Sequence, residues 1–487
     1  MKQTKIAAVA LAVMFLPALA GCKGGEVSVP DFTSEGGVRF TAYAAPTVKK
    51  KVDGLTEEHY QKLSEAGFNK AVALYEGSSA ARGNDTYETI VKRSEKAQAD
   101  ALAALNLAEK YGIKYYVRDW SFYGLGKNFK DITTKEQFET VISKMFDENN
   151  AYIKHSAYGG NFGFDEPDIK EMETIVWQAE LYNEYVAKNG NGGELFVNLL
   201  PAYVGDNTVS LDPEKQTTYT EYVDYYFENI APLLGYVSYD YYPFKVTGNG
   251  KKYVRNTYYY NYEMMAERCK KGDYELRAFV QAKGDFTGTR SLCGVGDLRF
   301  QIYSGMAFGC REFTYYTYSS EVNETNYTTE DGYSLYDLNT GKYTWLYDAA
   351  KTVNNEVHAM EKAYAAYDWE GVMYKNADEM YENQLFANLD SPLESHEKIA
   401  IQACTQDTLV GTFTANDESN ANKHAFMLVN AADPSADKDD EVTLKFNGAK
   451  SLLMYRLGQK IVVPLSKEGT YTFKLYPGEG RFVIPLS

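Results

Sequence analysis

The chain has 487 residues, a formal net charge of −17 and 15 % aromatic residues, among them 43 tyrosines. The negative charge argues against nucleic acid as a partner, because phosphate binding needs a basic stripe that this sequence does not offer. A chain this long exceeds one typical domain, so we expect two. Tyrosine combines a flat apolar face with a hydroxyl and suits stacking on sugar rings, although a general compositional bias would also explain the surplus.

Residues 1–22 have the features of a bacterial lipoprotein signal. Lys2 and Lys5 precede the apolar stretch of residues 6–20, which is too short to span a bilayer comfortably. The run "LAGC", ending at Cys22, resembles the lipobox in which the cysteine is acylated after cleavage. The alternative is an ordinary signal peptide with an incidental cysteine. We therefore expect a protein anchored to the membrane at Cys22, facing outside the cytoplasm, with residues 23–37 as a polar tether.

The remaining cysteines and the five histidines do not predict a metal site or a cofactor. No CxxC pair occurs, and a disulfide is possible in an oxidising compartment but cannot be assigned from spacing. Nothing in the sequence indicates an oligomeric state. These cysteines are Cys269, Cys293, Cys310 and Cys404.

Strand-like and helix-like stretches alternate from residue 38 to residue 367. Eight strands are expected at 38–46, 68–77, 114–121, 158–167, 194–203, 235–244, 274–282 and 311–319. Helices are expected at 56–67, 85–112, 168–190, 297–310 and 343–367. This alternation predicts a (β/α)₈ barrel over 38–367. A doubly wound open sheet is the alternative, but it would normally carry a glycine-rich turn after its first strand, which residues 41–54 lack.

The pattern changes after residue 367. Residues 368–487 contain short strands separated by turns, without helices between them, as in "AFMLVNAA", "EVTLKF" and "SLLMYRL". This pattern predicts a C-terminal β-sandwich.

In such barrels the reacting groups lie at the C-terminal ends of the strands. The residues at these predicted ends are rich in carboxylates, amides and aromatics, the equipment of glycoside hydrolysis. Metal hydrolysis and serine or cysteine triads are correspondingly disfavoured. The candidates are Glu76, Asp119, Trp120, Asp165, Glu166, Tyr203, Asp240, Tyr241, Tyr242, Gln281 and Tyr315.

The sequence "FDEP", which ends at Pro167, resembles the end of strand four in the glycoside hydrolase superfamily that includes the β-galactosidase-like enzymes. In that superfamily this strand typically ends Asn-Glu-Pro, and the glutamate is the acid/base. Residues 298–319 are also similar to its passage from helix seven to strand eight, and a C-terminal β-sandwich is common there. The resemblance implies a glycosidase with Glu166 as general acid/base. The competing structural role for Glu166 is to place negative charge at a helix N-terminus.

Two departures from the superfamily pattern matter. Asp165 stands where asparagine is usual, and Gln281 ends the strand that normally supplies a nucleophilic glutamate. The pair Asp165–Glu166 looks like the adjacent Asp-Glu of barrel enzymes that cleave N-acetylhexosaminides. There the acetamide oxygen of the substrate attacks, the glutamate protonates the leaving oxygen, and the aspartate orients the acetamido group. A strand-six tyrosine commonly assists, for which Tyr239, Tyr241 and Tyr242 are candidates.

Other interpretations remain open. Asp240 could act as nucleophile or base with Glu166 as acid, although binding sugar hydroxyls is its simpler role. A carbohydrate-binding lipoprotein that has lost catalysis would explain Gln281. A solute-binding lipoprotein of a sugar importer is disfavoured, because its two α/β lobes would not leave a helix-free C-terminal segment.

Overall fold

The computed structural model of the chain describes residues 30–34, 36–45, 54–72, 86–125, 132–205, 209, 217–284, 290, 292–320, 334–378, 380 and 383–487. Residues 32–487 form one compact unit. Cys22, the signal sequence, most of the tether and Glu76 lie outside the described residues, so the expectations about them stay predictions.

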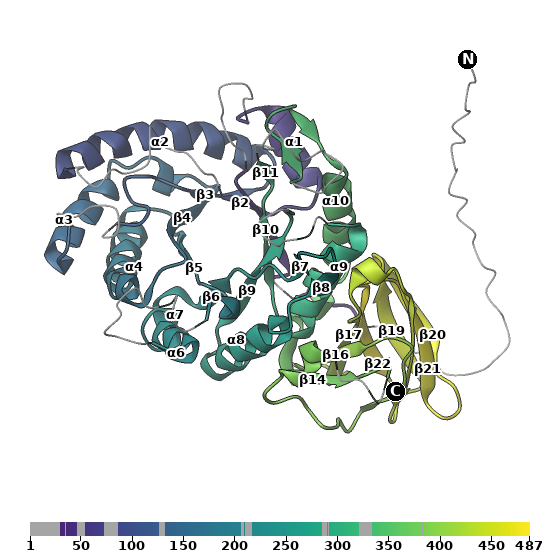
Figure 1. Cartoon of the computed structure of the whole chain (residues 1–487). Coiled ribbons are helices and arrows are strands. Elements are labelled where there is room, and N and C mark those ends of the chain that lie inside the picture. The colour runs from purple at the N-terminus through teal and green to yellow at the C-terminus, as the bar shows by residue number, and fades with distance from the viewer. Residues whose placement is uncertain are drawn as a thin grey trace, which may run out of the picture. The chain divides into compact units, whose positions relative to one another are not determined.

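Eight parallel strands form the barrel (Figure 1). They follow the order β5-β4-β3-β2-β1-β10-β9-β6. A parallel bridge between Leu199 and Tyr239 joins the two ends of that order and closes the ring. The predicted (β/α)₈ fold is therefore confirmed. The strands are β1 (Arg39–Tyr43), β2 (Lys70–Val72), β3 (Lys114–Val117), β4 (Tyr158–Asp165), β5 (Glu194–Asn198), β6 (Tyr236–Tyr239), β9 (Glu275–Gln281) and β10 (Glu312–Tyr316).

Helices surround the strands, as Figure 1 shows. Several begin at a side-chain cap: Thr56, Thr134 and Asp168 each accept a hydrogen bond from a backbone N–H three residues on. The stretch predicted as one helix over 343–367 is two helices, and His358 at the break contacts Glu361 Oε2 and Gly67 O. The helices are α1 (Glu57–Glu65), α2 (Tyr87–Lys110), α3 (Lys135–Met145), α4 (Ile169–Asn189), α6 (Tyr219–Asn229), α7 (Ala231–Leu234), α8 (Tyr258–Gly272), α9 (Val295–Ala307), α10 (Trp345–His358) and α11 (Glu361–Ala365).

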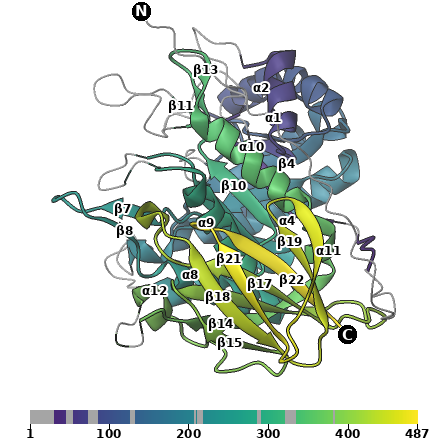
Figure 2. The same ribbon diagram turned by 90° about the vertical axis from the view of Figure 1, so that its right-hand side faces the viewer.

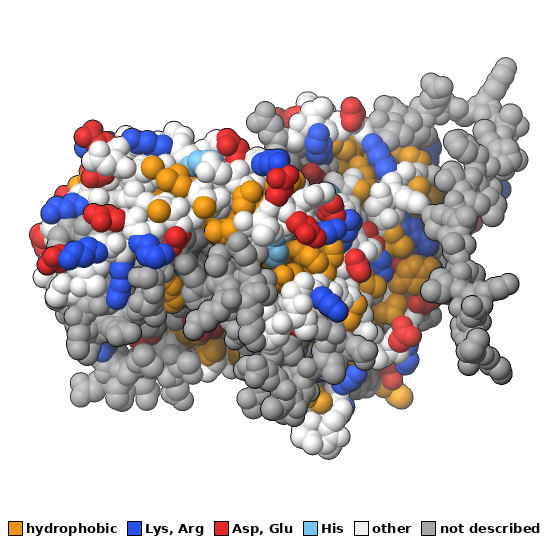
Figure 3. Space-filling view, turned by 90° about the horizontal axis from the view of Figure 1, so that it is seen from above, with side chains coloured by type: hydrophobic (Ala, Val, Ile, Leu, Met, Phe, Trp, Pro, Cys, Tyr) orange, Lys and Arg blue, Asp and Glu red, His pale blue; other side chains and the backbone are white. Residues whose placement is uncertain are grey.

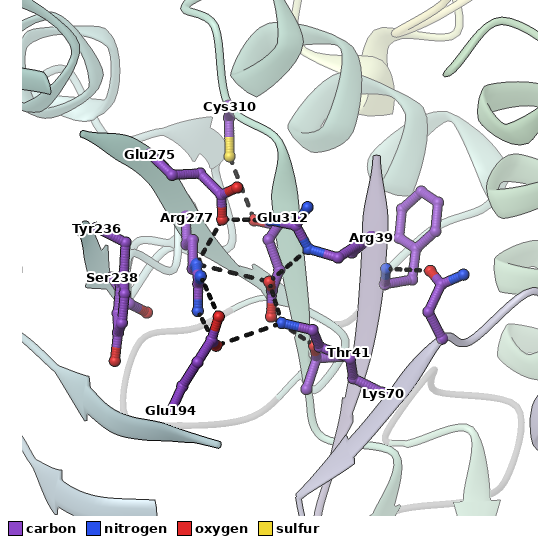
Figure 4. A network of polar contacts seen from close by, with 12 residues as sticks. Arg39, Thr41, Lys70, Glu194, Tyr236, Ser238, Glu275, Arg277, Cys310 and Glu312 are labelled. Carbon is purple, nitrogen blue, oxygen red and sulfur yellow. Dashed lines mark hydrogen bonds and ion pairs between the residues drawn. The ribbon is translucent and has the colours of Figure 1, made fainter. Parts of the chain in front are cut away.

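The interior of the barrel is layered along the strands. On β5, Glu194, Phe196 and Asn198 lie two residues apart and therefore share one face of the strand. Glu194 belongs to a network of ion pairs near the start of the strands (Figure 4). Phe196 packs in an aromatic cluster with Phe162 and Phe279. Asn198 reaches the cavity described below.

The ion network joins several strands with balanced charge, as Figure 4 shows. The carboxylate of Glu312 lies 2.8 Å from Lys70 Nζ, 3.0 Å from Arg39 Nε and 3.5 Å from Arg277 Nε. Three cations face three carboxylates, those of Glu194, Glu275 and Glu312. The lower part of the barrel is thus filled by paired charges rather than by aliphatic layers.

Antiparallel sheets make up the C-terminal part (Figure 2). The larger sheet has the order β14-β16-β17-β22-β19-β20 and the smaller β15-β18-β21. Their cores face one another through buried residues such as Val410, Phe426 and Phe473. A short helix, α12 (Gln384–Ala387), interrupts the segment that was predicted to lack helices. The strands are β14 (Tyr367–Lys375), β15 (Ile399–Ala403), β16 (Thr408–Ala415), β17 (His424–Asn430), β18 (Asp440–Phe446), β19 (Ser451–Arg456), β20 (Gln459–Pro464), β21 (Thr470–Leu475) and β22 (Gly480–Leu486).

The larger sheet packs directly on helix α9. Trp369 Nε1 donates to the carbonyl oxygen of Ala307 at 2.9 Å, and a Cβ on Gly411 would lie 2.2 Å from that same oxygen. Glycine at 411 is therefore what permits this close approach. The sequence-based domain boundaries at 37/38 and 367/368 stay predictions.

One face of the surface, the described helices and the described cysteines bear on the expectations from the sequence. On the face shown in Figure 3, cationic and anionic side chains are interspersed. Among the described helices none has the length and apolar character to cross a bilayer. Cys269, Cys293, Cys310 and Cys404 are present as thiols rather than as disulfides.

Candidate active site

A cavity of about 330 Å³ opens at the C-terminal ends of the barrel strands. This is the position at which barrels of this type carry their sites, and the volume suits a small ligand. The lining combines three carboxylates, two cations, an amide and aromatic rings. Its residues are Asp165, Glu166, Asn198, Tyr203, Asp240, Tyr242, Lys245, Arg255, Phe279 and Tyr316.

Asp165, the last residue of β4, is held by two donors. Tyr43 Oη donates to Asp165 Oδ2 at 3.2 Å, and Asn198 Nδ2 donates to Asp165 Oδ1 at 3.2 Å. Arg118 Nη1 in turn donates to Tyr43 Oη at 3.3 Å. These donors stabilise the carboxylate and fix its orientation.

Glu166 follows in a left-handed conformation, with φ of 49°. This region is uncommon for a residue with a β-carbon, and such residues concentrate at functional sites. Its N–H donates to the carbonyl of Asn198 at 2.9 Å, and its side chain is exposed in the cavity. The helix N-terminus is capped by Asp168, whose Oδ1 accepts from Glu171 N at 2.8 Å. Capping is therefore not the role of Glu166.

Asp240 lies directly after β6 and is only 3 % exposed. Asn198 Nδ2 lies 3.5 Å from Asp240 Oδ1, so one amide faces both aspartates. Burial, followed by the negative charges of Glu166 and Asp165, raises the pKa of Asp240 well above its usual value. Asp240 therefore tends to hold a proton where an exposed aspartate would have lost it.

The cations come from a hairpin inserted between β6 and α8. Its strands are β7 (Phe244–Val246) and β8 (Lys252–Val254), and it carries Lys245 and Arg255 to the cavity. The guanidinium of Arg255 lies over the Tyr203 ring, 3.8 Å from its centroid. The cavity is thus lined by carboxylates from the ends of β4 and β6 and by cations from the hairpin.

Five predicted site residues line this cavity: Asp165, Glu166, Tyr203, Asp240 and Tyr242. Two other predicted residues, Tyr315 and Tyr241, do not line the cavity, but the next residue in the chain does in each case. Tyr315 is buried and donates to Asn354 Oδ1 of α10 at 2.7 Å, while its neighbour Tyr316 lines the cavity. Likewise, Tyr241 shares a 2.7 Å hydrogen bond with Thr257 beside the lining residue Tyr242. Alternation along an extended chain explains both cases.

Asp119, Trp120 and Gln281 are placed elsewhere. Asp119 is fully buried and accepts from Ser121 N at 2.8 Å, and burial raises its pKa to about 6. Trp120 packs on Tyr123 beside Arg118. Gln281 is also fully buried.

Gln281 anchors the cationic hairpin. Its Oε1 accepts from Phe244 N at 3.0 Å, and its own N–H donates to Gln301 Oε1 at 2.6 Å. The position where the superfamily resemblance implies a nucleophile therefore holds the start of β7. None of the three lining carboxylates comes from β9.

Sequence reasoning missed several residues of the site. Asn198 and Tyr43 precede the strand ends assigned from sequence, and Lys245 and Arg255 belong to a hairpin that was not predicted. Alternation along the predicted strand 194–203 places Glu194, Phe196 and Asn198 on one face, and Asn198 is the polar residue of that face nearer the C-terminal end. No comparable signal marks Arg255.

Among the described residues, one group of three side chains could hold a metal ion, and it lies in the C-terminal sheets. The ligand atoms of Glu370, His396 and His424 lie within 4.8 Å of one another. However, His396 Nδ1 accepts from Lys398 N at 3.1 Å, which places the proton of the neutral ring on Nε2, facing Glu370 at 3.4 Å. When one ring nitrogen of a histidine binds a metal, the other normally donates a hydrogen bond, whereas Nδ1 of His396 accepts one. His396 and Glu370 are therefore better described as a hydrogen-bonded pair.

Comparison with known proteins gives similarity of fold only. No protein-family model matches the sequence, and no curated protein matches it. A family 5 glycoside hydrolase from Bacteroides vulgatus is 10 % identical with a TM-score of 0.51, over 92 % of this chain and 89 % of that chain. A second structure, described as a glycoside hydrolase, is 11 % identical with a TM-score of 0.50, over 92 % of each chain.

A β-galactosidase from the psychrophilic Marinomonas ef1 is 11 % identical with a TM-score of 0.45. The match covers 66 % of this chain and only 60 % of the β-galactosidase chain. The two neighbours with TM-scores of 0.50 and 0.51 are glycoside hydrolases, and at these identities they support the fold of this chain alone.

Proposed function

We propose that the chain is a glycoside hydrolase that cleaves extracellular glycans while anchored to the membrane at Cys22. The observation that carries this proposal is the convergence of Asp165, Glu166 and Asp240 in one cavity lined by aromatic rings. Paired carboxylates beside stacking surfaces are what glycosidic bond cleavage requires. The lipobox-like "LAGC" supports the anchor.

Glu166 is the proposed general acid/base. It is exposed to the cavity and is not used as a helix cap. For 2-acetamido sugars the acetamide oxygen would attack the anomeric carbon while Glu166 protonates the leaving oxygen. Asp165, oriented by Tyr43 and Asn198, would then align the acetamido group. This substrate-assisted route needs no carboxylate at Gln281.

Asp240 is less suited to act as a nucleophile. A nucleophile must be ionised, whereas burial and the charges of Glu166 and Asp165 raise the pKa of Asp240. A protonated Asp240 can donate a hydrogen bond to a sugar hydroxyl or supply a proton. We therefore assign Asp240 a donor role beside Glu166.

The test is hydrolysis of matched chromogenic β-glycosides with and without a 2-acetamido group. Wild type is compared with Glu166→Gln, Asp240→Asn and the control Glu173→Gln, an exposed carboxylate on α4. Activity confined to acetamido substrates, lost in Glu166→Gln and kept in the control, supports the substrate-assisted mechanism. Equal activity in wild type and Glu166→Gln would refute the role of Glu166.

One observation favours a second candidate, a sugar-binding lipoprotein without catalysis. Gln281 stands in place of the nucleophile and its side chain is committed to Phe244. Sugar binding by wild type without hydrolysis of any substrate would favour this candidate. A solute-binding protein of an importer fits less well, because eight strands close one barrel rather than form two lobes.

A further inference from the structure

We propose that the cavity binds a saccharide carrying an oxyanion, either a carboxylate or a sulfate ester, through Arg255 and Lys245. This inference rests on the proposed function, since it names the substrate class of the same cavity. The carboxylates would face the glycosidic bond, and the two cations would bind the anionic substituent.

Arg255 provides the main evidence. Its backbone N–H donates to Pro243 O at 2.9 Å, and its guanidinium stacks on Tyr203 at 3.8 Å from the ring centroid. Within the part of the chain that the structure describes, this guanidinium makes no ion pair, and its Nε is buried without an acceptor. A buried donor left without an acceptor is costly, so a ligand oxygen would satisfy it. The planar guanidinium matches carboxylate and sulfate groups, which offer two oxygens side by side.

Lys245 adds a second positive charge to the lining of the same cavity. Burial, together with the charge of Arg255, lowers the pKa of Lys245 to about 8. Like charges brought together in this way disfavour one another. An anion bound near both groups would relieve that repulsion and raise the pKa of the lysine again.

The cations are not required as counter-ions for Asp165. That carboxylate accepts from Tyr43 and Asn198, and Arg118 supports Tyr43 from the other side. Tyr203 lines the same cavity, and the Arg255 guanidinium lies over its ring, 3.8 Å from the centroid. A sugar bound in this cavity would therefore be exposed both to the carboxylates and to Arg255.

The experiment compares matched pairs of glycosides that differ only in the substituent at C6. These are glucuronide against glucoside, galacturonide against galactoside, and 6-O-sulfo sugar against the unsulfated parent. The kcat/KM ratio of anionic to neutral member is measured for wild type, Arg255→Met and Lys245→Met. Methionine keeps an apolar stem over Tyr203 and removes the charge. The control is Lys251→Met, an exposed charge on the same hairpin that does not line the cavity.

We expect wild type to prefer the anionic member of at least one pair. Arg255→Met should lower that preference about 10- to 100-fold, the loss expected for hydrogen bonds to a charged group. Lys251→Met should leave it unchanged. The uronide and sulfo pairs then identify which oxyanion is bound. No preference in wild type for any anionic sugar, or an equal ratio in wild type and Arg255→Met, would overturn the inference.

Binding separates this inference from the proposed function. If no glycoside is cleaved, thermal shift with the same sugar pairs still tests the cavity. Stabilisation by the anionic sugar alone, lost in Arg255→Met, would support the anion site while the hydrolase proposal fails. Cleavage of neutral glycosides with no effect of Arg255→Met would retain the hydrolase and refute the anion site.

Discussion

Replacing Glu312 by glutamine should strongly destabilise the barrel. The Glu312 side chain is 3 % exposed and lies within 3.5 Å of Lys70, Arg39 and Arg277. It also accepts from Thr41 Oγ1 at 2.8 Å. Glutamine preserves the shape but leaves three cations, two of them buried, facing two carboxylates.

The expected cost is about 3–5 kcal/mol, the loss found when one partner of a buried ion pair is removed. At roughly 2 °C per kcal/mol, the lower end of the range for large domains, the thermal midpoint should fall by about 6–10 °C. The assay is thermal unfolding followed by circular dichroism at pH 7. Glu180→Gln is the matched control, because Glu180 pairs with Lys135 on the surface. Its midpoint should not move measurably.

The same network predicts sensitivity to acid. Burial alone would raise the pKa of Glu194, but Arg277 and Lys70 outweigh it and hold this pKa at about 2. Because the folded pKa is below the unfolded one, this stabilisation is present above about pH 4.5 and is lost as pH falls towards 2. The thermal midpoint of wild type should therefore fall as the pH is lowered from about 4.5 towards 2. The midpoint of Glu312→Gln should fall less steeply over the same pH range. If Glu312→Gln unfolds at the wild-type midpoint at pH 7, the reasoning is refuted, because loss of this carboxylate would then carry no cost.

Three further changes test other parts of the structure. Asp240→Asn should raise the thermal midpoint more at pH 8 than at pH 5. The pKa of Asp240 is raised in the folded state, so wild type loses stability as the pH rises and the asparagine variant does not. An equal gain at both pH values would contradict this. Gln281→Ala leaves Phe244 N–H without its acceptor, at a cost of about 1–3 kcal/mol, and should speed hydrogen exchange in the hairpin over 244–254. Gly411→Ala should cost about 1–3 kcal/mol by thermal unfolding, because its Cβ would meet Ala307 O at 2.2 Å; an unchanged midpoint would show that β16 can move away from α9.

The barrel was predictable because strand and helix patterns alternate along the sequence. Strand β5 illustrates both the success and its limit. The apolar run beginning at Glu194 predicted a strand to residue 203, but the strand ends at Asn198 and Tyr203 lies on a 3₁₀ turn, η2 (Ala202–Val204). The periodicity of the sequence shows that a strand exists. Where the strand ends depends on how far its backbone groups form hydrogen bonds with the neighbouring strands.

The charged layer in the barrel could not be predicted from the sequence. Lys70, Glu194 and Arg277 each stand near the start of a strand, where a charged residue usually faces solvent. The burial of Lys70 and Arg277 depends on other strands of the ring bringing opposite charges within ion-pair distance. Such pairing is a property of the closed ring, and no local pattern reports it.

The adjacent carboxylates show how a sequence rule can fail at the site itself. Successive residues of a strand point to opposite faces, so Asp165 and Glu166 should not share a cavity. The strand, however, has a register shift between Phe162 and Phe164, and its regular geometry ends at Asp165. Glu166 then adopts a left-handed conformation while its N–H stays bonded to Asn198 O. This change of backbone direction allows both side chains to line the cavity, and the strain it requires is what a catalytic role for Glu166 would explain.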